Sequence, residues 1–155
     1  MNNKYEFILS FGVPGMRAVC TEDPVWERIS AGIESVFVDG GRASLVMHEY
    51  NGDDDSGEKI QAVIMEGVKG AYRILLRVNS NDPKRELLKW WGGGDCNVVD
   101  FVNYLDQRWD PRGWLFDLNF AKKVMKVFFD KGRLDDVSNF KSLWDVDFSF
   151  KPRPD

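Results

Sequence analysis

The segment from Trp114 to Gly132, WLFDLNFAKKVMKVFFDKG, constrains the fold more than any other stretch of this sequence. Apolar residues recur at helical spacing from Leu118 to Phe129 and cover most of the helix circumference. Asp117 stands where a carboxylate can accept hydrogen bonds from the first N–H groups of a helix, and Gly132 suits its end. The remaining polar face is narrow and consists of Asn119, Lys122, Lys123, Lys126 and Asp130. We therefore predict a core helix that touches neighbours on more than one side.

A second helix is predicted between Asp23-Pro24 and Gly40-Gly41. Asp23 is expected to cap the helix, and Pro24 to occupy its first position. Gly40-Gly41 is expected to end it. The buried stripe predicted from helical spacing consists of Trp26, Ile29, Ile33 and Val36 or Phe37.

Alternation of apolar and polar residues indicates strands elsewhere in the chain. The residues from Tyr5 to Phe11 alternate, and residues 43–50 and 60–66 form a predicted antiparallel hairpin around the polar loop NGDDDSGEK. The clearest alternation is AYRILLRV, residues 71–78. We predict a strand rather than a short helix for residues 85–91. An irregular or extended segment is predicted for residues 98–110. A last edge strand is predicted from the alternation of Val146, Phe148 and Phe150.

The length and composition of the chain set the fold class. A chain of 155 residues with 43% hydrophobic residues can bury a core without disulfide or metal support. We predict a single α+β domain over residues 1–155, with an antiparallel sheet of about four to six strands and two packed helices. Residues 135–155 are expected to add an edge strand and to end in a disordered tail.

The net charge and the cysteine content indicate which cellular compartment and which kind of partner to expect. The net charge of −4 argues against a nucleic-acid binder, which usually carries a basic face. Cys20 and Cys96 have no motif spacing and are expected to be reduced and buried. The short apolar run from Phe7 to Leu9 is too small for a signal-peptide core, and no run approaches the roughly 20 apolar residues of a membrane span. We predict a cytoplasmic protein that does not bind membranes.

The loop NGDDDSG resembles a calcium loop only in part. Asn51, Asp53 and Asp55 occupy positions one, three and five of the loop pattern. Ser56 stands where the turn requires glycine, and Ala62 where a bidentate glutamate is required. A solvated hairpin loop is therefore predicted, and no metal site.

Motifs for catalysis or cofactor binding are also missing from the sequence. His48 is the only histidine, and no G-x-S-x-G nucleophile motif accompanies it. The run Gly92-Gly93-Gly94 lacks the Lys and Ser/Thr of a phosphate-binding loop. Cys96 has no adjacent cation to lower its pKa. We predict no catalytic residue and no cofactor.

Two groups of carboxylates remain to be interpreted. One is the run Asp53-Asp54-Asp55, and the other extends from Asp95 to Asp117 through Asp100, Asp106 and Asp110. They could be solvated loops, the acid and base of a hydrolase, or an acidic surface for a basic partner. Exposed tryptophans would strengthen such a surface, because Trp is a favoured interface anchor. The residues predicted to bind a partner are Asp53, Asp54, Asp55, Asp106, Asp110, Trp109 and Trp114.

Five segments together carry a family resemblance: YEFILSFGVPG, PVWERISAGIESV, GGRASLVM, GAYRILLRV and WDPRGWLFDLNFAKKVMKVFFDKG. With these, the chain from Lys4 to Leu134 resembles a family of small bacterial proteins of the immunity type, which accompany polymorphic or contact-dependent toxins. The most specific part is the WD-x-R turn at 109–112 followed by the DL-x-F helix. The residues that carry the resemblance are core positions, turns and helix caps. No functional residue is therefore transferred from the family to this chain.

The resemblance implies a non-catalytic, cytosolic protein that binds a cognate toxin domain and blocks it. Such toxins are often basic nucleases, so the partner is expected to be basic and to meet an acidic surface. Protection would require nanomolar binding, about −12 kcal/mol. The rival hypotheses are a small carboxylate-dependent hydrolase and a small-ligand-binding or scaffold module. An apolar cavity between the sheet and the helices would favour the latter. The oligomeric state stays open.

Overall fold

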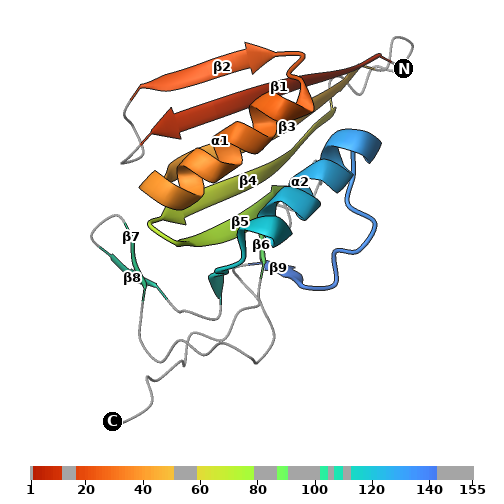
Figure 1. Cartoon of the computed structure of the whole chain (residues 1–155). Helices are drawn as coiled ribbons and strands as arrows, with labels where there is room; N and C mark the ends of the chain where they lie inside the picture. Colours follow the sequence, from red (N-terminus) through yellow and green to blue (C-terminus); the bar gives the residue numbers. More distant parts are fainter. Residues whose placement is uncertain are drawn as a thin grey trace, which may run out of the picture.

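The computed structural model describes residues 2–11, 17–50, 59–78, 87–90, 102–104, 107–109 and 113–142. In these residues, an antiparallel sheet carries two helices, α1 (Trp26–Asp39) and α2 (Leu118–Lys131), as Figure 1 shows. The sheet order is β2-β1-β3-β4-β5-β6-β9. Its strands are β1 (Asn2–Phe11), β2 (Ala18–Glu22), β3 (Gly41–Tyr50), β4 (Lys59–Val68), β5 (Ala71–Arg77), β6 (Leu87–Trp90) and β9 (Phe140–Ser142). A separate hairpin joins β7 (Val102–Tyr104) to β8 (Gln107–Trp109).

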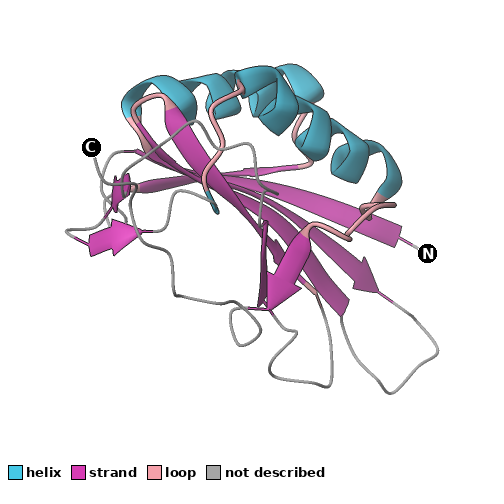
Figure 2. Ribbon diagram, turned by 90° about the horizontal axis from the view of Figure 1, so that it is seen from below, coloured by secondary structure: helices cyan, strands magenta, loops and turns pink. Residues whose placement is uncertain are grey.

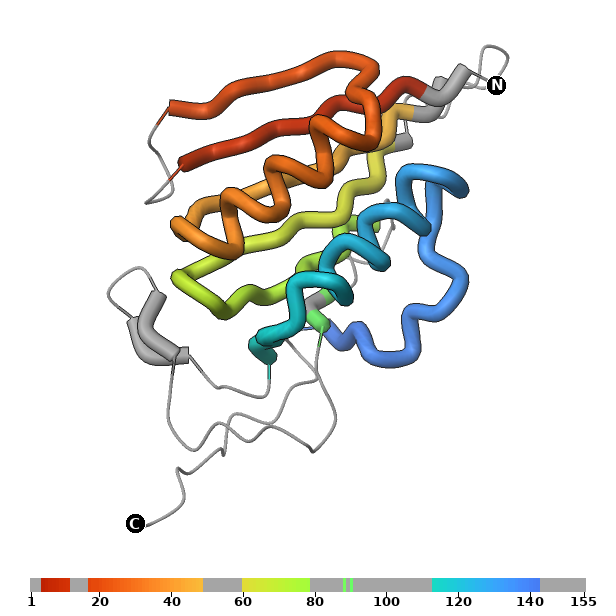
Figure 3. Tube along the Cα trace, in the orientation of Figure 1, coloured from red at the N-terminus to blue at the C-terminus, as the bar shows by residue number. Residues whose placement is uncertain are grey.

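The predicted α+β class, with an antiparallel sheet and two helices, is confirmed. The main sheet has seven strands in the described residues, rather than four to six, because two short segments lengthen its edges. Ala18–Glu22 pairs with β1, and Phe140–Ser142 returns after α2 to pair with β6, which Figure 3 lets the reader follow. The alternation at 146–150 lies outside the described residues.

The strands predicted in the interior of the sheet are confirmed in the described ranges. The hairpin of β3 and β4 pairs Ala43 with Met65 and Leu45 with Val63. Residues 87–90 form a strand, and the extended interpretation of residues 98–110 agrees with β7 and β8. β5 differs from the expected half-buried pattern, because its residues are buried on both faces from Ala71 to Leu76.

Both helices pack on the same face of the sheet (Figure 2). That face carries alternate residues of the strands, such as Phe7 of β1 and Leu45 of β3. The helices contribute the buried residues Ile29, Ile33 and Val36 of α1, and Ala121, Met125 and Phe128 of α2. These residues form one apolar core with the strands.

The prediction for α2 is confirmed. The Asp117 carboxylate accepts a hydrogen bond from the N–H of Asn119 at 2.9 Å, and Gly132 ends the helix with φ +71°. Phe129 packs against Tyr5 with ring centroids 5.6 Å apart, and Phe120 packs against Trp90 at 5.0 Å. The helix therefore touches neighbours on two sides, as its wide apolar surface predicts.

The predicted start of α1 is wrong. The helix begins at Trp26, its N-cap residue is Val25, and no side chain caps it. Asp23 has a positive φ of 47°, and its N–H donates to the carbonyl oxygen of Tyr5 at 2.9 Å. This bond links the turn after β2 to β1, so Asp23 stabilises the sheet and does not cap the helix. The predicted end is confirmed, with Gly40 at φ +83° directly after Asp39.

Two glycines let α1 approach the sheet closely. A Cβ atom on Gly32 of α1 would lie 2.6 Å from the Phe7 ring. A Cβ atom on Gly67 of β4 would lie 2.7 Å from the backbone oxygen of Val36. Both separations are shorter than real carbon contacts, so a larger side chain would push the helix away from the sheet.

Candidate functional site

The structure tests the predicted partner-binding residues only in part. Asp53, Asp54, Asp55, Asp106 and Asp110 lie outside the described residues. Trp109 is the last residue of β8, and its backbone alone is described.

The prediction that Trp114 is an exposed anchor is wrong, since only 3% of it is exposed. Leu115 and Tyr72 exchange two backbone hydrogen bonds, of 2.6 and 2.9 Å, which hold this segment against β5. Trp114 packs with Ala71, and the Arg73 guanidinium lies over its ring at 5.6 Å from the centroid. Trp114 is therefore a structural residue of the sheet.

His48 and Cys20 do not form a nucleophilic site. His48 Nε2 lies 3.7 Å from the carboxylate of Glu6, and the same carboxylate lies 3.9 Å from Cys20 Sγ. Cys20 is exposed rather than buried as expected, and it is a free thiol. Desolvation and the charges of Glu6 and Glu22 raise the pKa of the Cys20 thiol, which lowers its thiolate fraction. Cys96 lies outside the described residues.

The acidic residues near the end of α2 have no property of a general acid. The hydrogen bond and charge of Lys131 lower the pKa of Asp135, and hydrogen bonds from Ser138 lower that of Asp136. Both carboxylates are thus ionised at neutral pH, whereas a general acid must hold a proton there. Across the described ranges, no three His, Cys, Asp or Glu side chains gather in a way that could hold a metal ion.

The sheet face opposite the helices carries a groove of about 230 Å³. Its lining combines two arginines and two serines with four apolar side chains, and all of them come from neighbouring strands. The residues are Ile8 and Ser10 of β1, Arg42, Ser44 and Val46 of β3, Ala62 and Ile64 of β4, and Arg77 of β5. We call this the open-face groove.

The register of the strands explains why this face is hollow. Ser44 stands opposite Ile64, and Val46 stands opposite Ala62. The small side chains Ser44 and Ala62 therefore lie diagonally between larger neighbours. Ala62 and Ile64 are each 2% exposed and belong with Leu75 to a second apolar core cluster. They close the base of the hollow, and the polar groups border it.

Arg42 is the cation whose environment points to a ligand. Its Nε atom is buried and has no hydrogen-bond partner among the described residues. Glu66 is the residue opposite Arg42 on β4, but its carboxylate forms an ion pair of 3.2 Å with Arg73, and both of these side chains are buried. Ser10 stands opposite Arg42 on the other side. Arg42 thus contributes a guanidinium to the border of the groove.

Arg77 is exposed and stands at the diagonal corner of the groove from Arg42. It pairs with Ala62, and Ala62 pairs with Val46, four residues beyond Arg42 on β3. Strand spacing and rise place the two α carbons roughly 17 Å apart. A guanidinium at each end of an apolar floor can hold carboxylates in fork geometry, and the serine hydroxyls can add hydrogen bonds.

A second hollow lies between α2 and the edge of the sheet, with a volume of about 280 Å³. Its walls are mainly apolar, and Lys123, Asp135 and Asp136 border it. The apolar lining residues are Trp90, Phe120, Val124, Val127, Leu134 and Phe140. We call this the α2 cleft.

Sequence reasoning did not find the open-face groove. The alternation of 71–78 does place Arg73 and Arg77 on the face opposite Tyr72, Ile74 and Leu76. This alternation predicts a polar face on one strand, but it does not predict which other strands share that face. Only the pairing of β1, β3, β4 and β5 brings Arg42, Arg77, Ser10 and Ser44 around a common floor.

The fold and groove define an α+β domain with an arginine-bordered sheet face. No family model matches the chain, and no curated protein matches it. Among solved structures, the chain is similar to the crystal structure of a hypothetical protein from Neisseria gonorrhoeae. The TM-score is 0.58 at 10% sequence identity, over 84% of this chain and 90% of that one. At this identity the likeness concerns the fold alone. Within the described residues, neither helix has the length and apolar character needed to span a membrane.

Proposed function

We propose that this chain is a non-catalytic binding protein of the immunity type, which attaches to a toxin domain and blocks its activity. The observation that supports the proposal is the open-face groove, where arginines border an apolar floor on the side of the sheet away from the helices. The resemblance of residues 4–134 to immunity-type proteins supplies the class of partner.

The chemistry of the groove favours binding over catalysis. The guanidinium groups of Arg42 and Arg77 carry several hydrogen-bond donors and no acceptor, so they are suited to hold anions. Arginine beside apolar surface is also typical of the centre of protein interfaces. A carboxylate-dependent hydrolase would need a carboxyl group with a raised pKa, whereas Lys131 lowers the pKa of Asp135 and hydrogen bonds from Ser138 lower the pKa of Asp136.

The form of the groove favours a macromolecular partner. One of its borders is the exposed side chain of Arg77, which a protein partner can reach from solvent. A stable interface buries roughly 800 Å² per side, so such a partner would also contact surface beyond the groove.

The test has two stages. The tagged chain is first used to capture partners from its native cells at moderate salt, with identification by mass spectrometry. The captured toxin domain is then expressed with and without this chain in a sensitive host. We expect a one-to-one complex with nanomolar affinity and restored growth. A toxin domain that binds tightly but remains equally toxic would contradict the proposal.

A second candidate function, the binding of a small apolar ligand, is favoured by the α2 cleft. The cleft has the mainly apolar walls that such a ligand requires, and Trp90 within it offers a fluorescence signal. Titration with an apolar fluorescent probe should change the tryptophan emission of the protein, through Trp90. Val124→Phe, which fills the cleft, should weaken binding of the probe, whereas Val38→Phe on the exposed surface of α1 should not. Equal binding by all three proteins would exclude this cleft as the site.

A further inference from the structure

We infer that the outer edge of β2 is a dimerisation surface, where the β2 strand of a second copy of this chain pairs in antiparallel orientation, centred on Cys20. The sheets of the two copies then join into one continuous sheet. This inference goes beyond the proposed function, because it concerns the association of the chain with itself and involves no toxin.

The backbone of β2 presents hydrogen-bonding groups on its outer side. The N–H of Asp23 donates to the carbonyl oxygen of Tyr5, so these two opposite residues form a hydrogen-bonded pair. Hydrogen-bonded and non-hydrogen-bonded pairs alternate along an antiparallel ladder. The residues whose N–H and C=O groups point away from β1 are therefore Ala18, Cys20 and Glu22. Among the described residues, no turn or loop hydrogen bond uses these groups.

This edge of the sheet is open to a further strand. β2 is the outermost strand, and Figure 1 shows no other described element along its outer side. Edge strands are commonly protected by lysine, proline, a bulge or a short length. The opposite edge, β9, has 3 residues with Lys141 at its centre, whereas β2 has 5 residues with neither lysine nor proline and pairs with β1 without a bulge.

The charges at the two ends of β2 favour a second copy as the strand that pairs there. Arg17 precedes the strand, and Glu22 and Asp23 end it. The residues 12–16 that join β1 to β2, GVPGM, contain no charged residue. Antiparallel pairing of two identical strands brings the cationic end of each against the acidic end of the other, and opposite charges across a strand pair are stabilising. Parallel pairing would bring like charges together.

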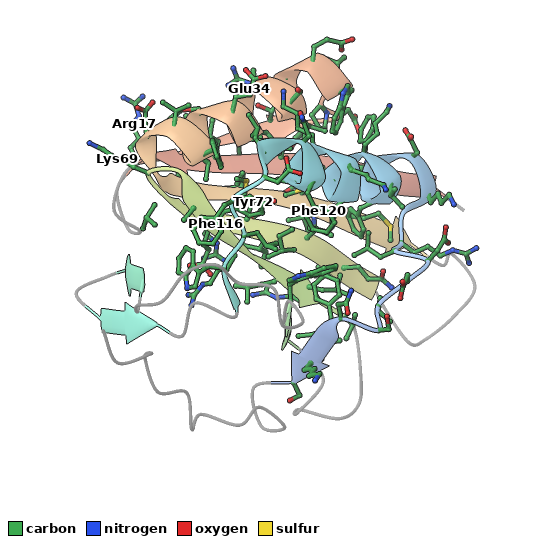
Figure 4. The ribbon with its side chains drawn as sticks, turned by 60° about the horizontal axis from the view of Figure 1, so that its bottom comes forward. Arg17, Glu34, Lys69, Tyr72, Phe116 and Phe120 are labelled. Atoms are coloured by element: carbon green, nitrogen blue, oxygen red, sulfur yellow. The ribbon has the colours of Figure 1, made fainter. Side chains whose placement is uncertain are left out.

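The neighbouring elements leave this charge difference between the two ends in place. Figure 4 shows the Arg17 side chain at the periphery of the molecule, at the same end as Lys69. The other charged residues near the two ends come in pairs of opposite sign. They are Lys4 with Glu6 of β1 and Glu27 with Arg28 of α1 at the acidic end, and Asp39 of α1 with Arg42 of β3 at the cationic end.

The register of the dimer follows from the same residues. Centring on Cys20 pairs all 5 residues of β2, and it places Ala18 opposite Glu22 and Arg17 opposite Asp23 of the other copy. The outward-pointing groups of one strand then meet those of the other, and each such pair exchanges two hydrogen bonds. A register shifted in either direction pairs fewer residues and separates the opposite charges.

Exposed apolar side chains lie at both ends of this edge. Phe11 ends β1 next to Arg17 and is 47% exposed, whereas Val25 follows Asp23 by two residues and is 62% exposed. Because Asp23 of one copy stands opposite Arg17 of the other, dimerisation brings Val25 towards Phe11 of the other copy. The contact is smaller than a standard interface of about 1,600 Å², so we expect a reversible dimer with a Kd of about 10 μM.

The first experiment is sedimentation equilibrium of the full chain from about 1 to about 300 μM, which brackets the expected Kd. We expect the average mass to rise from that of the monomer to that of the dimer. Amide hydrogen exchange followed by ¹⁵N NMR locates the contact. Exchange of the outward-pointing amide of Cys20 should slow as concentration rises, whereas the amides of Val19 and Thr21, which point towards β1, should be protected at every concentration.

Variants at the edge test the register and the charges. Arg17→Glu places like charges opposite each other and should weaken the dimer about tenfold. Lys141→Glu is the matched control, since it makes the same change at an exposed position on the opposite edge strand, β9. Cys20→Pro removes an outward-pointing N–H at an edge position, where proline is tolerated, and should weaken the dimer more than tenfold. Circular dichroism reports whether each variant keeps its fold.

A disulfide trap gives a second measurement of the register. The α carbons of a hydrogen-bonded antiparallel pair are about 5.5 Å apart, within the range that a disulfide spans. Diamide should therefore couple the Cys20 thiols of two copies: an S–S bond forms, both S–H bonds break, and diamide takes up the two protons and two electrons. Peptide mass spectrometry should identify the Cys20–Cys20 link, and Cys20→Ser should prevent it.

Several results would overturn the inference. They are a monomer mass at every concentration, a folded Cys20→Pro variant with native dimer affinity, equal effects of Arg17→Glu and Lys141→Glu, or cross-linked dimers that do not contain Cys20. If Cys20→Pro does not fold, the two charge variants decide the question. The toxin assay is separate, so a chain that stays monomeric yet rescues growth would leave the proposed function standing.

Discussion

The hydroxyl group of Tyr72 donates a hydrogen bond of 2.5 Å to the backbone oxygen of Asp117 and so ties β5 to the N-cap residue of α2. Tyr72 is fully buried, and its backbone also pairs with Leu115 on the same chain segment. One residue in the sheet thus fixes both the approach to the helix and its first turn.

Replacing Tyr72 with Phe should lower the free energy of unfolding by about 1 kcal/mol. The ring still fills the core, and the carbonyl oxygen of Asp117 keeps the hydrogen bond from the N–H of Ala121 at 3.4 Å, so the loss is limited. Urea unfolding followed by circular dichroism measures the change. Tyr5→Phe is the control, because no described hydrogen bond involves the Tyr5 hydroxyl. Equal losses in the two variants would show that the bond to Asp117 contributes nothing specific.

Stability should fall in alkali for a related reason. Burial, followed by the charge of Asp117, raises the pKa of the Tyr72 hydroxyl far above its ordinary value of 10.0. The folded protein keeps this proton at a pH where the unfolded chain loses it, so the stabilisation is present below about pH 10 and is lost as the pH rises further.

The free energy of unfolding of the native protein should therefore decline between about pH 9 and about pH 11, and Tyr72→Phe should decline less. Tyr5 leaves a residual slope in the variant, because burial and then Asp130 raise its pKa as well. Urea unfolding at a series of pH values measures both slopes. Parallel slopes would contradict the assignment to Tyr72.

Phe128→Ala should destabilise the protein by ~3–5 kcal/mol, because the side chain is fully buried between α2 and the sheet. Phe116→Ala is the matched control, since this phenylalanine is 45% exposed, and it should cost less than about 1 kcal/mol. Chemical denaturation of both variants provides the measurement. A loss below about 1 kcal/mol for Phe128→Ala would refute its place in the core.

Gly67→Ala should destabilise the protein by about 1–3 kcal/mol through overpacking, because the new Cβ atom would meet the backbone oxygen of Val36 at 2.7 Å. Gly70 offers a contrast. It has φ +77° with no heavy atom within 4 Å of an added Cβ, so only backbone conformation limits substitution there.

Gly70→Asn should therefore be nearly neutral, since Asn tolerates the left-handed region, whereas Gly70→Ala should cost about 1 kcal/mol. Thermal unfolding of the variants separates the two mechanisms. If Gly67→Ala were as stable as the native protein, the close approach of α1 to β4 would be disproved.

Local chemistry made α2 predictable. Its cap, its apolar spacing and its terminal glycine all lie within one stretch, and each acts on neighbouring backbone groups. The start of α1 was less predictable. Asp23-Pro24 has the composition of a helix start, but the hydrogen bond from Asp23 to Tyr5 of β1 uses the residue in a turn. A contact distant in the sequence decided its conformation.

The candidate site was still less accessible to sequence reasoning. The predicted interface relied on acidic runs and tryptophans, and Trp114 is buried against Arg73 and Ala71. The groove uses residues that are scattered from Ile8 to Arg77. None of them belongs to a motif, because a binding face on a sheet requires only that side chains share one side.

The sequence by itself determined the α+β class, the α2 helix with its cap, and the strands of the sheet interior, because hydrophobic periodicity and turn residues act locally. Only the tertiary structure decided the edge strands β2 and β9, the burial of Trp114, and the position of Arg42 and Arg77 at the border of one groove. The reason is the register of the strands. A shift of one residue would move each of these side chains to the opposite face of the sheet.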